Sequence, residues 1–153
     1  MEINDTIPDF ELDATSGQRF RLSDCLGHPV VLYFYPKDDT PGCTDEGRQF
    51  TELHEAFAAL GCTVWGLSRD SLASHEKFRA KMAFPFHLLS DPDEIACEIF
   101  GVMKLKNMYG KQVRGIERST FLIDRHGRLA QAWRAVKVPE HAQRVLEAVQ
   151  QLP

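Results

Sequence analysis

Residues 30–47 read VVLYFYPKDDTPGCTDEG, passing from an apolar run through a short polar loop to a cysteine. Each residue from Val30 to Tyr35 is β-branched, aliphatic or aromatic, which is typical of a strand covered on both faces of a sheet. Beyond the loop, apolar residues recur at spacings of three and four: Phe50, Leu53, Phe57 and Leu60. With Gly61 as a stop signal, this pattern predicts a central strand, a loop and a long amphipathic helix over residues 43–60.

Strands and helices alternate along the rest of the chain. After the long helix we expect, in order, a strand (62–68), a helix (71–82), a strand (86–90), a helix (93–102), a hairpin (119–134) and a helix (139–152). Asp70 or Ser71 caps the helix 71–82, and Pro139 takes the first position of the last helix. This order predicts an α/β architecture, a mixed sheet with helices on both faces, in one domain of residues 1–153.

Composition and charge exclude several classes of function. The 153 residues carry a net charge of -4 with both signs intermixed, so no basic face is available for nucleic acid or an anionic membrane. The segment MEINDTIPDFEL lacks the basic start and apolar run of a signal peptide. Four cysteines without a CxxC pair are typical of free thiols in a reducing compartment. We therefore expect a cytoplasmic protein with neither nucleic acid nor membrane as a partner.

Cys43 follows the loop that joins the central strand to its helix. This loop lies at the carboxyl edge of the sheet, where α/β folds place their sites, and the N–H groups of a first helical turn favour a thiolate. Pro36 and Pro41 stiffen the loop, Gly42 admits a ligand close to the backbone, and the Thr40 hydroxyl can donate and accept hydrogen bonds. These residues suit a narrow pocket for a small oxygen-containing substrate. A buried, inert cysteine behind an ordinary turn is the alternative that the residues leave open.

A family resemblance extends over nearly the whole chain. Pro36, Thr40 and Cys43 fit the Pro-x-x-x-Thr-x-x-Cys signature of peroxiredoxins, and FYPKDDTPGCT resembles the bacterioferritin comigratory protein, or peroxiredoxin Q, branch. The segments GLSRDSLASHEKF, LLSDPDE, YGKQVRGIERSTFLID and AWRAVKVPEH occur in the same order as in that branch. The resemblance implies a thioredoxin-like fold and an enzyme that reduces hydrogen peroxide and organic hydroperoxides with a thiol.

The resemblance also assigns roles to particular residues. It implies that Cys43 attacks the peroxide and becomes a sulfenic acid, with Thr40 and the amides of Gly42 and Cys43 holding the substrate. Arg118, in IERSTF, matches the active-site arginine of the family, and its planar fork of donors suits a developing negative charge. Glu46 matches a position whose side chain holds the arginine and the loop in place.

Both positions at which relatives carry a resolving cysteine hold arginine, Arg48 and Arg79. The expected helix places Cys62 about 25 Å from Cys43, and the expected strand places Cys25 about 20 Å away, whereas a disulfide needs Cα atoms within about 7 Å. We therefore expect a one-cysteine mechanism with an external reductant, either thioredoxin or glutathione with glutaredoxin. Cys97, at a strand end in an apolar setting, stays open as an internal resolving cysteine.

Other functions find less support in the sequence. The histidines are scattered without metal-ligand spacing, so we expect no metal and no cofactor. A thiol-disulfide oxidoreductase would need a CxxC mate for Cys43. A non-enzymatic peroxide sensor or chaperone with the same cysteine stays open. The resemblance and the lack of a long exposed apolar run favour a monomer.

Overall fold

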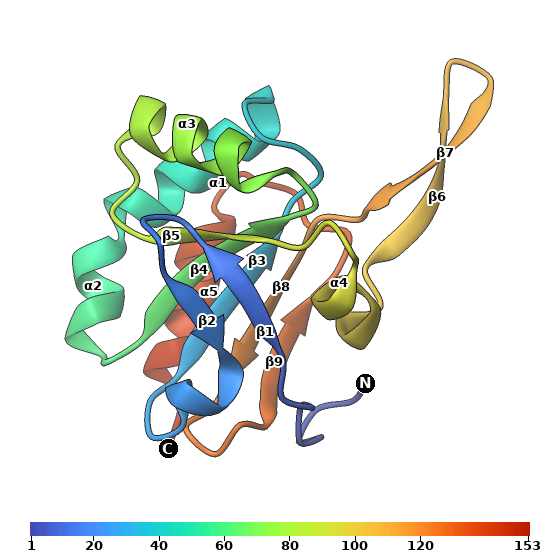
Figure 1. Cartoon of the computed structure of the whole chain (residues 1–153). Helices are drawn as coiled ribbons and strands as arrows, with labels where there is room; N and C mark the ends of the chain where they lie inside the picture. The colour runs from blue at the N-terminus through green and yellow to red at the C-terminus, as the bar shows by residue number, and fades with distance from the viewer.

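The computed structural model describes residues 1–153 and contains a seven-stranded sheet with helices on both faces (Figure 1). The strands, in spatial order, are β2 (Arg19–Arg21), β1 (Glu11–Ala14), β5 (His87–Ser90), β4 (Thr63–Ser68), β3 (Val30–Phe34), β8 (Ser119–Ile123) and β9 (Leu129–Trp133). β3, β4 and β5 are parallel, whereas the other neighbouring pairs are antiparallel. The expected mixed α/β sheet is therefore confirmed.

Five α-helices and a short 3-10 helix surround this sheet. They are η1 (Leu22–Cys25), α1 (Pro41–Glu52), α2 (His54–Ala59), α3 (Leu72–Met82), α4 (Ile95–Phe100) and α5 (His141–Gln150). α4 packs on one face of the sheet, and the other four α-helices pack on the opposite face. None of these helices is long and apolar enough to cross a membrane.

The central strand β3 is buried at all five residues. Phe34 points to one face of the sheet, where its ring lies 5.3 Å from that of Phe100 in α4. Tyr33 points to the other face and stacks on Phe50 of α1 with ring centroids 4.7 Å apart. Aromatic contacts therefore fix β3 from both sides, and with it the start of the loop that leads to Cys43.

Three helix predictions were wrong in their bounds. The helix expected over residues 43–60 starts at Pro41 and is divided at Leu53, whose ψ of 7° ends α1 before α2 begins. No glycine or proline marks this break, and α2 packs separately on β4 and α5. The last helix starts at His141 instead of Pro139, because Glu140 adopts a left-handed conformation with φ of 62°.

Other parts of the chain also depart from the sequence pattern. The helix expected over residues 93–102 is limited to α4, whose first N–H groups donate to the Asp91 carboxylate. Neither the β1–β2 hairpin nor the two-stranded sheet of β6 (Met103–Met108) and β7 (Lys111–Ile116) was predicted. The β6–β7 hairpin projects away from the body of the molecule (Figure 1). The cap at Ser71 is confirmed, since its side chain accepts from the Ser74 N–H.

We predict that Gly47→Ala destabilises the fold by about 1–3 kcal/mol, despite the better helix propensity of alanine. A Cβ at position 47 would lie 2.3 Å from Cζ of Phe84, a buried ring stacked on Phe86 that has no room to move. Gly115→Ala is the matched control, because its Cβ would meet no atom within 4 Å. Urea unfolding of both variants tests this, and equal midpoints would contradict it.

Candidate active site

Cys43 lies in the first turn of α1, near the edge at which the parallel strands β3, β4 and β5 end. Thr40 is the N-cap, and Pro41 is the first helical residue, where the missing N–H of proline costs no hydrogen bond. The first intrahelical bond runs from the Thr44 N–H to the Thr40 carbonyl. The N–H groups of Gly42 and Cys43 consequently have no acceptor within the helix. Cys43 is only 2% exposed, and its thiol lies at the positive end of the helix dipole.

Arg118, immediately before β8, brings a positive charge to this thiol. Its Nη2 donates to Cys43 Sγ at 3.3 Å, and its Nη1 donates to Glu46 Oε1 at 2.6 Å. Burial would lower the Arg118 pKa, but the charges of Glu46 and Cys43 outweigh burial and the pKa is raised. The guanidinium therefore stays charged and joins the sulfur to the carboxylate.

Glu46 is completely buried one turn after Cys43 on α1. Burial raises its pKa to about 7, although the charge and the hydrogen bond of Arg118 act in the opposite direction. Its second oxygen, Oε2, has no hydrogen-bond partner. Glu46 therefore orients Arg118 through one oxygen, while its burial disfavours the charged form of the carboxyl group.

The loop before α1 supplies the remaining predicted residues. The Thr40 hydroxyl donates to the Lys37 carbonyl at 2.9 Å, which leaves its lone pairs free to accept a hydrogen bond from a ligand. Pro36 and Pro41 flank the loop, and neither has an N–H to satisfy. Gly42 passes so close to Arg118 that a Cβ at this position would lie 3.0 Å from Nη2. The structure thus brings all seven predicted site residues to one end of β3.

The other three cysteines are buried free thiols away from this site. Cys25 and Cys97 belong to the core on one face of the sheet, whereas Cys43 belongs to the core on the other. Cys62 shares the face of Cys43 but lies immediately before β4, at the opposite end of the parallel strands. Burial raises the pKa of Cys25 to about 11 and that of Cys62 to about 12, and it also raises the pKa of Cys97.

The two positions at which the resemblance implies a resolving cysteine hold arginines that make other contacts in this chain. Arg48 is exposed on α1 and pairs with Asp45 at 3.4 Å. Arg79 on α3 donates to the Phe86 carbonyl at 2.9 Å and to the Ser16 hydroxyl at 3.3 Å. Arg79 therefore ties α3 to the strands beneath it.

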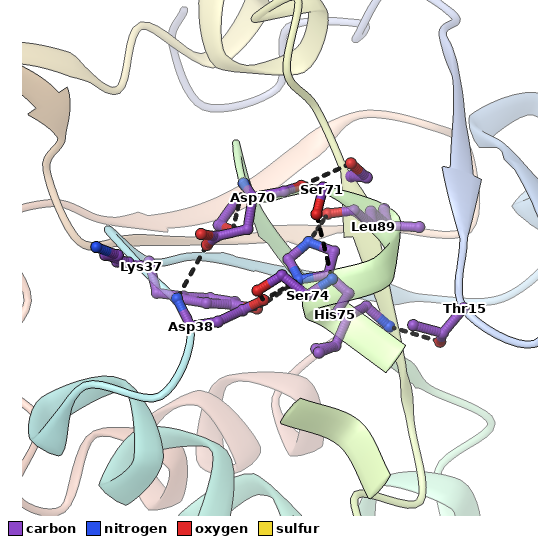
Figure 2. A network of polar contacts seen from close by, with 12 residues as sticks. Thr15, Lys37, Asp38, Asp70, Ser71, Ser74, His75 and Leu89 are labelled. Carbon is purple, nitrogen blue, oxygen red and sulfur yellow. Dashed lines mark hydrogen bonds and ion pairs between the residues drawn. The ribbon is translucent and has the colours of Figure 1, made fainter. Parts of the chain in front are cut away.

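Sequence reasoning missed a group of buried polar residues beside the loop. Asp38 contacts Asp70 and His75, whose side chains come from the segment after β4 and from α3 (Figure 2). His141 and Thr120 form a second buried pair at 2.8 Å. His75 falls at an apolar position of its helix, and this is the one local signal that could have indicated its burial.

Comparison with solved structures identifies the class of protein. A cysteine-to-serine mutant of Xylella fastidiosa PrxQ matches 98% of this chain and 96% of its own, with a TM-score of 0.94 and 47% identity. Xanthomonas campestris bacterioferritin comigratory protein, described for its alkyl peroxide reduction activity, matches 92% of this chain and 90% of its own with a TM-score of 0.88 and 51% identity. The fold is thus the thioredoxin-like fold of the peroxiredoxins.

Sequence comparison places the chain within this class. The AhpC/TSA family matches residues 3–132. Peroxiredoxin Bcp of Xanthomonas campestris pv. campestris is 52% identical over 141 residues, 92% of this chain and 88% of that protein. Peroxiredoxin Bcp of Bacillus subtilis is 50% identical over 152 residues, 99% and 95% of the two chains. The chain belongs to the AhpC/TSA family, in its bacterioferritin comigratory protein branch, and is a thiol peroxidase.

We predict a pH dependence of stability from His141, whose pKa is lowered from 6.5 to about 4 by burial and by Arg144 and Arg118. The unfolded chain binds this proton first, so the contribution of His141 to stability is present above pH 6.5 and is lost as the pH falls to about 4. The advantage of wild type over His141→Gln should therefore shrink by about 3 kcal/mol at most over that range.

Urea unfolding at several pH values measures this difference. Glu46, with its raised pKa, shifts stability in the opposite direction, but it is present in both proteins and cancels in the comparison. His126→Gln, in the exposed turn between β8 and β9, is the control. A constant difference between wild type and His141→Gln across the range would contradict the prediction.

Proposed function

We propose that this peroxiredoxin reduces hydrogen peroxide and organic hydroperoxides through Cys43 by a one-cysteine mechanism with an external thiol. The observation that carries the proposal is the Arg118 guanidinium, 3.3 Å from Cys43 Sγ and held at 2.6 Å by the buried Glu46. A fixed cation and unpaired N–H groups beside the sulfur are the surroundings that a cysteine nucleophile requires. The alkyl peroxide reduction activity described for the Xanthomonas campestris relative supports organic hydroperoxides as substrates.

In the proposed oxidation the Cys43 thiolate attacks one oxygen of ROOH. A bond forms between sulfur and that oxygen, the O–O bond breaks, and the other oxygen leaves as ROH after taking up a proton, so Cys43 becomes a sulfenic acid. Negative charge grows on the departing oxygen, and Arg118 stabilises it. Thr40 and the N–H groups of Gly42 and Cys43 hold the peroxide in line with the sulfur.

In the proposed reduction an external thiol attacks the Cys43 sulfenic acid and releases water, which leaves a mixed disulfide. A second thiol then regenerates the Cys43 thiol and leaves as a disulfide with the first. Thioredoxin, or glutathione with glutaredoxin, is the proposed donor. The position of Cys97 on the opposite face of the sheet supports an external donor over Cys97.

We place this cycle in the cytoplasm of a monomeric protein without nucleic acid or membrane as a partner. Four unpaired thiols suit a reducing compartment. The monomer rests on the branch resemblance, and a light-scattering mass clearly above 17.4 kDa would contradict it.

Single cysteine variants test the proposed cycle. We predict that Cys43→Ser abolishes peroxide consumption in excess thiol, while Cys25→Ser, Cys62→Ser and Cys97→Ser stay within about twofold of wild type. One equivalent of peroxide should add one oxygen atom to the reduced chain, trapped at Cys43 and detected as intact mass. If the chain instead loses the mass of two hydrogen atoms, an internal disulfide has formed, and this would contradict the one-cysteine mechanism. Consumption that stops below one turnover would indicate a sensor.

Gly42→Ala tests the position of Arg118 without removing a charge. The added Cβ would lie 3.0 Å from Nη2, so the guanidinium has to shift by a few tenths of an ångström, which changes its position relative to the sulfur. We predict that the second-order rate of Cys43 oxidation by hydrogen peroxide falls about tenfold, which corresponds to about 1.4 kcal/mol. Stopped-flow measurement with Gly115→Ala as the control checks this. A rate for Gly42→Ala equal to that of the control would remove Arg118 from the proposed mechanism.

A further inference from the structure

Asp38 is the buried residue through which the loop before Cys43 is hydrogen-bonded to the neighbouring elements (Figure 2). Its N–H donates to Asp70 Oδ2 at 2.9 Å. Its carboxylate accepts from the hydroxyl of Tyr35 at 2.6 Å, from the hydroxyl of Ser74 at 2.8 Å, and contacts His75 Nδ1 at 2.7 Å. Asp38 therefore links the end of β3 to the first turns of α3.

The hydrogen-bond partners of His75 determine its charge. Its Nε2 lies 2.8 Å from the Leu89 carbonyl, which can only accept, and its Nδ1 faces the Asp38 carboxylate. Nε2 must therefore carry a hydrogen, and the contact between Nδ1 and Asp38 needs one further proton, which a charged Asp38 leaves on His75. Burial alone would raise the Asp38 pKa, but the hydrogen bond and charge of His75 lower it, with Tyr35 and Ser74 contributing further. Asp38 and His75 thus form a buried ion pair.

The ligand atoms of Asp38, Asp70 and His75 lie within 4.8 Å of one another, as in a metal site. Each of them is already engaged in hydrogen bonds, and Asp70 Oδ2 accepts from both the Ser68 hydroxyl and the Asp38 N–H. The hydrogen bonds account for the cluster without an ion. The group fastens the loop.

We propose that the Asp38–His75 ion pair is a positioning pair that holds the Cys43 loop closed and sets the balance between the two halves of the catalytic cycle. This inference rests on the proposed function. A closed loop keeps Cys43, Thr40 and Arg118 in the arrangement that peroxide attack requires. In that arrangement the whole Cys43 residue is 2% exposed, so an external thiol reaches its sulfur only after the loop opens.

The Asp38–His75 pair holds the loop in position without touching the reacting atoms. It joins the loop to α3 and, through Leu89, to β5, but neither residue contacts the sulfur or Arg118. Weakening the Asp38–His75 pair should therefore slow the oxidation of Cys43, because this step needs the closed loop. It should speed up the reduction of the sulfenic acid, because this step needs the open loop. A purely structural role would change stability without moving the two half-reactions in opposite directions.

The substitution Asp38→Asn removes the negative charge of this side chain and nearly keeps its shape. The amide nearly matches the carboxylate in size, and it can donate to a neutral His75 while Nε2 still donates to Leu89, so hydrogen bonds remain but the ion pair is lost. The matched control is Asp39→Asn, the next residue, which pairs with Lys81 at an exposed site. Exposed pairs of this kind contribute little to stability.

Two rates are measured for each protein. One is oxidation of Cys43 by hydrogen peroxide in a single turnover, and the other is capture of the preformed sulfenic acid by thionitrobenzoate, a small coloured thiol. For Asp38→Asn we expect oxidation to slow about tenfold and capture to speed up about fivefold, with Asp39→Asn within about twofold of wild type on both. The proposal would be overturned if both rates of Asp38→Asn are unchanged or if both are lowered.

Ser74→Ala keeps the test valid if Asp38→Asn fails to fold, because it removes one hydrogen bond to Asp38 and leaves both charges in place. Ser74→Ala should slow the oxidation of Cys43 and speed up capture of the sulfenic acid, each by about two- to threefold. Unchanged rates in this folded variant would also overturn the proposal. A wild-type protein that forms no sulfenic acid at Cys43 would instead overturn the proposed function.

Discussion

The contact between Glu46 and Arg118 joins α1 to the start of β8, 72 residues apart in the sequence, and the geometry around the thiol depends on it. An ion pair with one partner fully buried loses hydration on both charges, so it requires partners that are held in place by the surrounding structure. The stack of Tyr33 on Phe50 supplies that constraint, because it fixes α1 against the central strand. Packing at the middle of the sheet thereby sets the position of a charge at its edge.

Local patterns in the sequence were sufficient for the parts of the fold that are locally determined. The apolar run of β3 can be satisfied only inside a sheet, and Ser71 marks the start of α3 by a hydrogen bond to a residue three positions away. Thr40 and Pro41 give a similar local signal for the start of α1, although the expected helix over residues 43–60 began two residues later than α1 does. The location of Cys43 at a helix N-terminus follows from these short-range signals.

The features that the sequence did not reveal arise from contacts between distant residues. The break at Leu53 depends on how α2 packs on β4 and α5, and no residue marks it. The β6–β7 strands are exposed at most positions, and apolar residues alternate with polar ones over only the first four residues of β6, too short a pattern to indicate a hairpin. The contact between Asp38 and His75 spans 37 residues, and the resemblance assigns a role to neither. Long-range polar contacts of this kind leave no periodic pattern.

The division of the core by the sheet limits how this chain could evolve toward a two-cysteine enzyme. A new cysteine could pair with Cys43 only from elements on its own face, and the positions used by relatives, Arg48 and Arg79, lie on α1 and α3 of that face. The two positions are not equivalent, because Arg48 makes only a surface pair whereas Arg79 fastens α3 to a backbone carbonyl. A single codon change at position 48 would therefore disturb the fold less than the same change at position 79. In terms of the proposed cycle, such a change would replace the external thiol in the attack on the sulfenic acid, while the disulfide that forms would still take its electrons from an external donor.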